Sequence, residues 1–198
     1  MASSVRPCVP VELRVRSGAG VRHNARRQWC ACSAAGITSL RRDKLPKGGF
    51  QEVFAVDLLA SGKLTEQALT AADGRSLVPL EIKRPMGMVL AERRVLNTTT
   101  ECFVDEVLPD SNALRAGVKV GDVLRLTTLV AAVRGKVDEI AYYSNPTSAK
   151  NRRALMVVDK QPFAKVMKAI ASNAEPVDLM DGRRAFESIC IVLERSSE

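Results

Sequence analysis

The chain has 198 residues, of which 46% are apolar but only 4% aromatic, so its core has to be built from Val, Leu, Ala and Met. No segment approaches the ~20 consecutive apolar residues that a membrane-spanning helix requires. The net charge of +8 does not indicate a nucleic-acid partner, because six arginines and one acid in residues 1–35 contribute +5 of it and leave +3 for the rest.

Residues 1–40 have the composition of an organelle transit peptide. They begin Met1-Ala2-Ser3-Ser4, are rich in Arg, Ser, Ala and Val, and lack the apolar core of a secretory signal. The cysteine- and alanine-rich residues 30–35 favour a chloroplast leader, for a stromal or thylakoid-associated protein, with the mitochondrion as second choice. The alternative is a disordered basic tail on a cytosolic protein.

Residues 41–76 are expected to be a linker followed by a short helical extension. Residues 41–47 are basic and interrupted by Pro and Gly, and Phe50, Val53, Phe54 and Leu58 then recur at helical spacing. Such a helix either packs on the domain that follows or docks on a partner.

Three strands are expected between residues 77 and 108. Residues 77–83 form the first strand, in which Pro79 is tolerated only near the start or at a sheet edge. Residues 88–93 form the second and residues 100–108 the third, each with side chains alternating between two faces. The turn Lys83-Arg84-Pro85-Met86-Gly87-Met88 joins the first two strands.

A short capped helix follows the third strand. Pro109 and Asp110 end the strand, Asp110 or Ser111 can cap a helix of one to two turns, and Gly117 can end that helix. Gly121 and Asp122 then turn the chain into a fourth strand, residues 123–128.

An insertion, residues 129–153, separates the fourth strand from the fifth, residues 154–159. A loop of this length is either functional or disordered. Pro162 begins a helix that carries apolar residues at helical spacing as far as Asn173. After a turn at Asp181 and Gly182, residues 188–194 form the last strand.

The order of these elements resembles that of a PDZ domain. The resemblance rests on the loop Pro85-Met86-Gly87-Met88, at the place of the family's Gly-Leu-Gly-Phe loop, and on the phrase formed by residues 107–124. It covers residues ~77–195 and implies a mainly β (α+β) fold, an antiparallel β-barrel or sandwich of five to six strands with two helices, in a domain of residues 77–196. The chain departs from the family at Pro85, which replaces the first glycine of the loop, and in the insertion.

The resemblance implies a protein-binding adaptor that captures C-terminal peptides by strand addition in the PDZ groove. The loop that binds the peptide carboxylate would consist of Arg84, Pro85, Met86, Gly87 and Met88. The groove would be lined by Leu90, Phe163, Met167 and Ile170. Phe163 stands where the family reads the third residue from the ligand's end, which favours an apolar residue there, and the methionines favour an apolar last residue. The alternative is that these apolar side chains belong to the core.

The residues do not favour an enzyme, a cofactor, a metal site or a small-molecule substrate. The only histidine, His23, lies in the expected leader, so catalytic sites that depend on histidine are not available to the remaining chain. Cys30 and Cys32 have no second pair with metal-site spacing. Cys102 and Cys190 lie in expected strands, where buried thiols are the first expectation and a disulfide between them the alternative.

The expected function is therefore a non-enzymatic adaptor, in the chloroplast, for the tails of other proteins. One alternative is a degenerate PDZ domain that serves as a structural or docking subunit of an organellar complex. Another is a regulatory piece associated with a PDZ-type protease. A peripheral membrane contact through Lys150, Arg152 and Arg153 is a further option.

Overall fold

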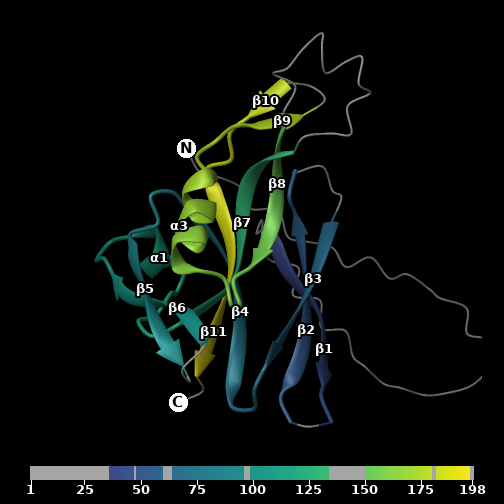
Figure 1. Cartoon of the computed structure of the whole chain (residues 1–198), viewed down its shortest axis with the longest axis vertical. Coiled ribbons are helices and arrows are strands. Elements are labelled where there is room, and N and C mark those ends of the chain that lie inside the picture. Colours follow the sequence, from purple (N-terminus) through teal and green to yellow (C-terminus); the bar gives the residue numbers. More distant parts are fainter. Residues whose placement is uncertain are drawn as a thin grey trace, which may run out of the picture. The chain divides into compact units, whose positions relative to one another are not determined.

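The computed structural model describes residues 36–46, 48–59, 64–95, 99–133, 150–179 and 182–196, which lie in one unit of the chain, residues 34–198. These residues form a mainly β fold with antiparallel sheets and two helices, as expected from the sequence. Figure 1 shows helix α3 (Phe163–Ser172) on one side of the largest sheet and strands β1 (Ile37–Lys44), β2 (Phe50–Asp57) and β3 (Leu64–Ala71) on the other.

The expected helical extension is wrong, because residues 50–57 form strand β2 between β1 and β3. The side chains of Phe50, Phe54 and Val56 alternate toward the interior with period two, and all three are buried. Strand β1 also begins inside the segment assigned to the leader, at Ile37, which is 3% exposed. Strands β1, β2 and β3 therefore form a three-stranded antiparallel sheet.

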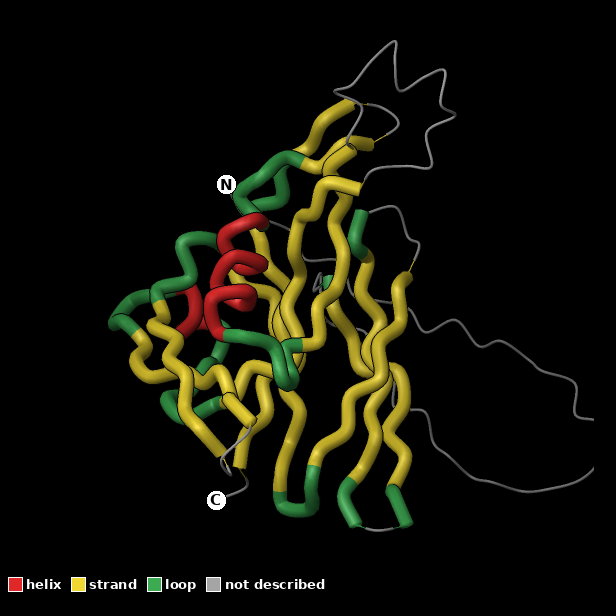
Figure 2. The backbone as a smooth tube through the Cα atoms, viewed as in Figure 1, coloured by secondary structure: helices red, strands yellow, loops and turns green. Residues whose placement is uncertain are grey.

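The second sheet contains the strands expected for the PDZ-like domain. Its order is β4 (Arg75–Lys83), β11 (Ser188–Ser196), β7 (Val123–Val133), β6 (Thr99–Val107) and β5 (Met88–Val95), and β8 (Lys150–Val157) pairs with the far end of β7. All of these pairings are antiparallel. Strand β5 is consequently an edge strand, paired with β6 alone among the described residues (Figure 2).

The first and last residues of the expected insertion, 129–133 and 150–153, belong to strands β7 and β8. β7 continues to Val133 and β8 begins at Lys150, so residues 134–149 of the insertion lie outside the described residues. A small hairpin that the sequence did not indicate, β9 (Val177–Leu179) with β10 (Gly182–Arg184), precedes the last strand.

The two helices begin where their sequence signals place them. Helix α1 (Asn112–Arg115) is capped by the Ser111 side chain, which accepts a hydrogen bond from the Leu114 N–H at 3.1 Å. Gly117 follows it with φ +86°, a conformation that glycine adopts without strain. Pro162 immediately precedes α3, and Asn173 ends it.

The core consists of two clusters on opposite faces of the second sheet. Val104, Leu124, Val166 and Ile191 belong to the cluster beneath α3. Phe54, Leu69, Leu126 and Val192 belong to the cluster beneath the three-stranded sheet. Strand β11 contributes to both clusters through alternating side chains, and β7 does so through Leu124 and Leu126, which lie on either side of a register shift. The three-stranded sheet is therefore packed on the domain as a second layer.

Candidate functional site

The carbonyl groups of three consecutive residues in the loop before β5 each accept a hydrogen bond from α1 or from the end of β6. The Pro85 C=O accepts a hydrogen bond from Nδ2 of Asn112 at 3.0 Å, and the Met86 C=O accepts one from the N–H of Ala113 at 2.8 Å. The Gly87 C=O accepts one from the N–H of Leu108 at 2.9 Å. The start of α1 and the end of β6 therefore fix the orientation of three successive peptide groups.

This arrangement turns three N–H groups outward. The peptide bonds that follow Pro85, Met86 and Gly87 are trans, the one cis bond of the described residues being the bond before Pro85. In a trans peptide the N–H points away from its carbonyl, so the N–H groups of residues 86–88 face away from α1 and β6. Within the described residues, those of Met86 and Gly87 have no acceptor. Neighbouring amides that face away from the same packed elements can together form an anion-binding nest.

Gly87 is required at the centre of this nest. Its φ is +70°, in the left-handed region, and a Cβ atom placed on it would lie 2.4 Å from Cβ of Ser111. The close approach of the loop to the helix cap is what allows Asn112 and Ala113 to reach the carbonyls. A side chain at position 87 would both strain the backbone and push the loop from α1.

The nest continues into the free edge of β5. Since the Gly87 carbonyl faces β6, the N–H of Met88 faces the free edge, and alternation along the strand gives Leu90 and Glu92 the same orientation. The register shift in this pair leaves the extra residue, Asp105, on β6, so the alternation on β5 is not interrupted. The edge can therefore accept an antiparallel strand whose end reaches the nest.

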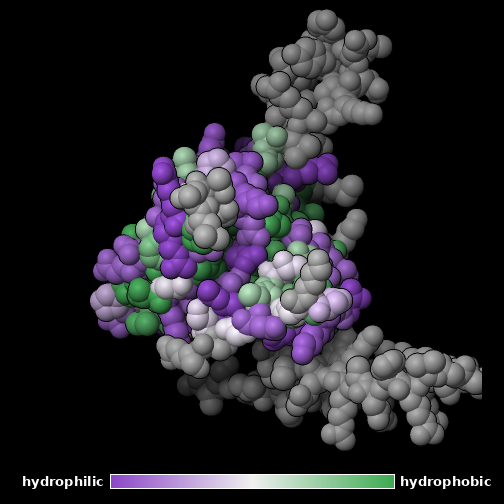
Figure 3. All heavy atoms as spheres, turned by 60° about the horizontal axis from the view of Figure 1, so that its bottom comes forward, coloured by the Kyte–Doolittle hydropathy of each residue, from purple (hydrophilic) through white to green (hydrophobic). Residues whose placement is uncertain are grey.

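Apolar side chains lie on both sides of the space beside this edge. Met86, Met88, Leu90 and Phe163 are partly buried and pack against the same core cluster as the buried face of α3. Met167 lies one turn after Phe163 and so shares its face of the helix, and it is 38% exposed. Figure 3 shows apolar side chains gathered on the part of the surface formed by β5 and α1.

Ile170 differs from the other expected groove residues. It is only 8% exposed and belongs to the core cluster beneath α3, as do Val166 and Ala169 on the buried face. Ile170 therefore supports the groove from below and is not on its surface.

The two basic residues before the loop, Lys83 and Arg84, have different environments. Lys83 is exposed at the end of β4. Arg84 is held by the segment before β11, because its N–H donates to the Glu187 C=O at 2.9 Å and its Nη2 donates to the Phe186 C=O at 2.8 Å. The buried Nε of Arg84 has no hydrogen-bond partner among the described residues. Arg84 thus anchors the loop in addition to carrying positive charge.

Arg153, one of the three residues considered for a membrane contact, is buried, with 7% exposed. Its Nη2 donates to the Ser188 C=O at 2.7 Å, and its guanidinium carbon lies 4.4 Å from the centroid of the Phe186 ring. Burial lowers the pKa of Arg153, an effect opposed by the nearby Cys190 and Glu81. Sequence position alone could not show this, since Arg152 next to it is exposed.

Cys102 and Cys190 are free and buried, as expected. Burial raises the pKa of each thiol to about 11, with a further rise from the charge of Glu92 at Cys102. Neither thiol is therefore in the thiolate form that nucleophilic chemistry requires at neutral pH.

Other kinds of site find no support in the part of the chain that the structure describes. Its His, Cys, Asp and Glu side chains form no group of three that could hold a metal ion. None of its helices is long and apolar enough to cross a membrane. Searches of protein-family models, curated proteins and solved structures gave no match to this chain.

Proposed function

We propose that this protein is a non-enzymatic adaptor that binds the C-terminal end of other polypeptides by adding it as a strand to β5. The observation that carries the proposal is the set of three outward N–H groups at residues 86–88, fixed by hydrogen bonds to the preceding carbonyls. These groups adjoin a free strand edge, and the combination suits a peptide that ends in a carboxylate.

The side chains beside the edge favour an apolar ligand. Phe163 would contact the third residue from the ligand's end, and Met86, Met88 and Met167 the last residue. Methionine adapts to side chains of different shape, so we expect a preference for apolar residues without a strict choice among them, and micromolar affinity. The composition of the residues before β1 supports a chloroplast location for this adaptor.

The test compares a peptide that has a free C-terminal carboxylate with the same peptide as its C-terminal amide. A suitable probe is Gly-Ser-Phe-Ser-Val-Ser-Val, titrated into the full chain and followed by calorimetry. We expect the amide to bind at least tenfold more weakly, because it removes the charge that the nest binds. Equal affinity for the two peptides would reject the nest as the carboxylate site.

A pair of variants tests whether the ligand lies between β5 and α3. Met167→Glu places a charge on the groove side of α3, whereas Lys168→Glu places one on the neighbouring exposed position that points away from the groove. We expect only Met167→Glu to abolish binding of the carboxylate peptide. Lys168→Glu makes the larger change in net charge, so a greater loss in that variant would indicate an electrostatic effect away from the groove.

A further inference from the structure

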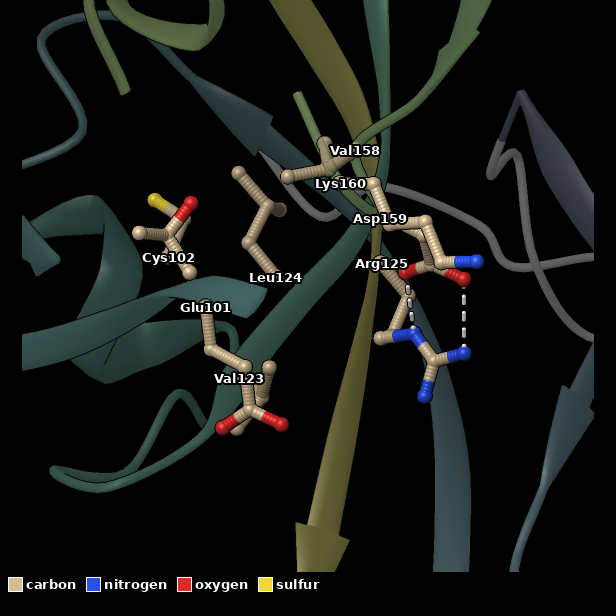
Figure 4. A pocket seen from close by; sticks show the side chains of 9 residues that line it. Glu101, Cys102, Val123, Leu124, Arg125, Val158, Asp159 and Lys160 are labelled. Atoms are coloured by element: carbon tan, nitrogen blue, oxygen red, sulfur yellow. Dashed lines mark hydrogen bonds and ion pairs between the residues drawn. The ribbon is translucent and has the colours of Figure 1, made fainter. Parts of the chain in front are cut away.

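A cavity of about 210 Å³ opens beside the start of β6, the start of β7 and the loop that leads into α3. Its apolar part is formed by Cys102, Leu124 and Val158, which belong to the core cluster beneath α3. The opposite side is formed by Arg125, Asp159 and Lys160, and Figure 4 shows the ion-paired Arg125 and Asp159 facing away from the apolar side chains. Apolar cavities of ~150 Å³ are large enough to bind benzene, so a large side chain can enter this one.

The register of the sheet relates this cavity to the proposed groove. If the last residue of an antiparallel ligand lies opposite Met88, the third from the end lies opposite Leu90 and the fifth opposite Glu92. Glu92 pairs with Cys102 in β6, so the fifth residue from the ligand's end falls in the same row as Cys102, which lies one strand beyond Glu92. A large side chain at that position would have to extend past Glu92 to reach the cavity, whose lining contains no residue of β5. The influence of the Glu92 charge on the Cys102 thiol agrees with this proximity.

The direction in which the ligand's side chains point is also consistent with a contact between the fifth residue and the cavity. Side chains of the last, third and fifth residues from the end point to one face of the added strand, which is the face of α3 and the core. Helix α3 begins at Phe163, and the residues just before it, Val158 and Asp159, line the cavity. The fifth side chain would therefore pass the start of α3 and meet an opening instead of the helix.

We propose that this cavity is a further specificity site, which takes a large apolar or aromatic side chain at the fifth residue from the ligand's C-terminus. This inference rests on the proposed function and extends the recognised segment from three to five residues. Of the ionic groups lining the cavity, Arg125 bonds Asp159 and Glu194, and Glu101 bonds Arg93. Lys160 is the one lining cation without an ion pair among the described residues, so the apolar side chains are expected to decide the choice against its single positive charge.

The test uses the carboxylate peptide Gly-Ser-Phe-Ser-Val-Ser-Val and three relatives in which Ala, Lys or Glu replaces Phe. We expect the Ala peptide to bind about tenfold more weakly, from the loss of one large buried side chain, and the Lys and Glu peptides to bind no better than the Ala peptide. Equal binding of the Phe and Ala peptides, or stronger binding of the Lys or Glu peptide, would overturn the inference.

A variant that fills the cavity tests whether the Phe side chain binds there. Thr100 lines the cavity, and Thr100→Trp should remove the difference between the Phe and Ala peptides while the Ala peptide still binds as it does to the wild type. Thr65→Trp, at an exposed strand position on β3, should keep the difference. A difference that survives in Thr100→Trp would contradict the proposed location.

The outcomes separate this inference from the proposed function. If all four carboxylate peptides bind equally and their amides do not bind, the groove stands and the cavity is not a specificity site. If no carboxylate peptide binds more tightly than its amide, the proposed function fails, and this inference fails with it.

Discussion

Arg195 donates two hydrogen bonds to the carboxylate of Asp122, from Nε at 2.8 Å and from Nη2 at 2.6 Å. Asp122 is 2% exposed and also accepts a hydrogen bond from the N–H of Lys119, and Arg195 donates a further one to the Gly117 C=O. The pair thus joins the last strand to the turn that follows α1. Since α1 holds the Met86 carbonyl, this ion pair indirectly supports the orientation of the nest.

Removing the Asp122 carboxylate should destabilise the fold. Asp122→Ala removes the buried carboxylate that accepts two hydrogen bonds from the partly buried Arg195 side chain. We expect a loss of about 3 kcal/mol in the free energy of unfolding, measured by urea denaturation. Asp43→Ala removes an ion pair with Arg41 in which both side chains are more than half exposed, and it should change the free energy by less than about 1 kcal/mol. A loss for Asp122→Ala no greater than for Asp43→Ala would contradict this role.

Two glycines with the same backbone angle should respond differently to alanine. Gly74 and Gly87 both have φ +70°, but a Cβ atom on Gly74 meets nothing within 4 Å, whereas one on Gly87 overlaps Ser111. We expect Gly74→Ala to cost about 1 to 2 kcal/mol from the backbone alone. Gly87→Ala should cost more and should weaken peptide binding, which Gly74→Ala should leave unchanged. Equal unfolding free energies for the two variants would mean that the loop is not packed against α1 as described.

The three-stranded sheet should unfold together with the rest of the described fold. Phe54 on β2 is fully buried against the second sheet, so Phe54→Ala should lower the free energy of unfolding by about 3 to 5 kcal/mol. Leu40→Ala on β1, where the side chain is 46% exposed, should change it by less than about 0.5 kcal/mol. If Phe54→Ala produced a separate early transition and left the main one unchanged, the sheet would be an independent unit.

The two buried thiols should make stability depend on alkaline pH. Their pKa values are raised from 9.0 to about 11 in the fold, so the folded state favours the neutral thiols. This contribution is complete below pH 9 and is lost as the pH rises from about 9 to about 11. The double variant Cys102→Ala with Cys190→Ala should show a shallower fall in unfolding free energy over that range. An identical slope for the wild type and the variant would contradict the raised pKa values.

Both helices and the main strands between residues 75 and 196 could be predicted because their signals are local, whereas the β9–β10 hairpin could not. Ser111 caps α1 and Gly117 follows it as expected, and Pro162 marks the start of α3. The hydrogen bonds that orient the nest could not be predicted, since Asn112 and Pro85 are 27 residues apart in the chain.

The N-terminal sheet could not be predicted because its pattern is ambiguous. Phe50, Phe54 and Val56 alternate as in a strand, but Glu52 occupies the buried position between the two phenylalanines and breaks the apolar run. Its carboxylate is satisfied by the Ser39 hydroxyl on β1, at 2.5 Å. Only the paired strand shows why a glutamate is tolerated there, and without it the spacing of Phe50, Val53 and Phe54 favours a helix.

The central claim is that the amides of residues 86–88 bind the carboxylate of a ligand, and amide NMR spectra of the ¹⁵N-labelled chain test it most directly. Titration with the carboxylate peptide should move the N–H signals of Met86, Gly87 and Met88 strongly downfield, as expected for new charge-assisted hydrogen bonds, and should leave that of Gly74 in place. The amide form of the peptide should not produce these shifts. Binding of the carboxylate peptide with the three signals unmoved would contradict the account.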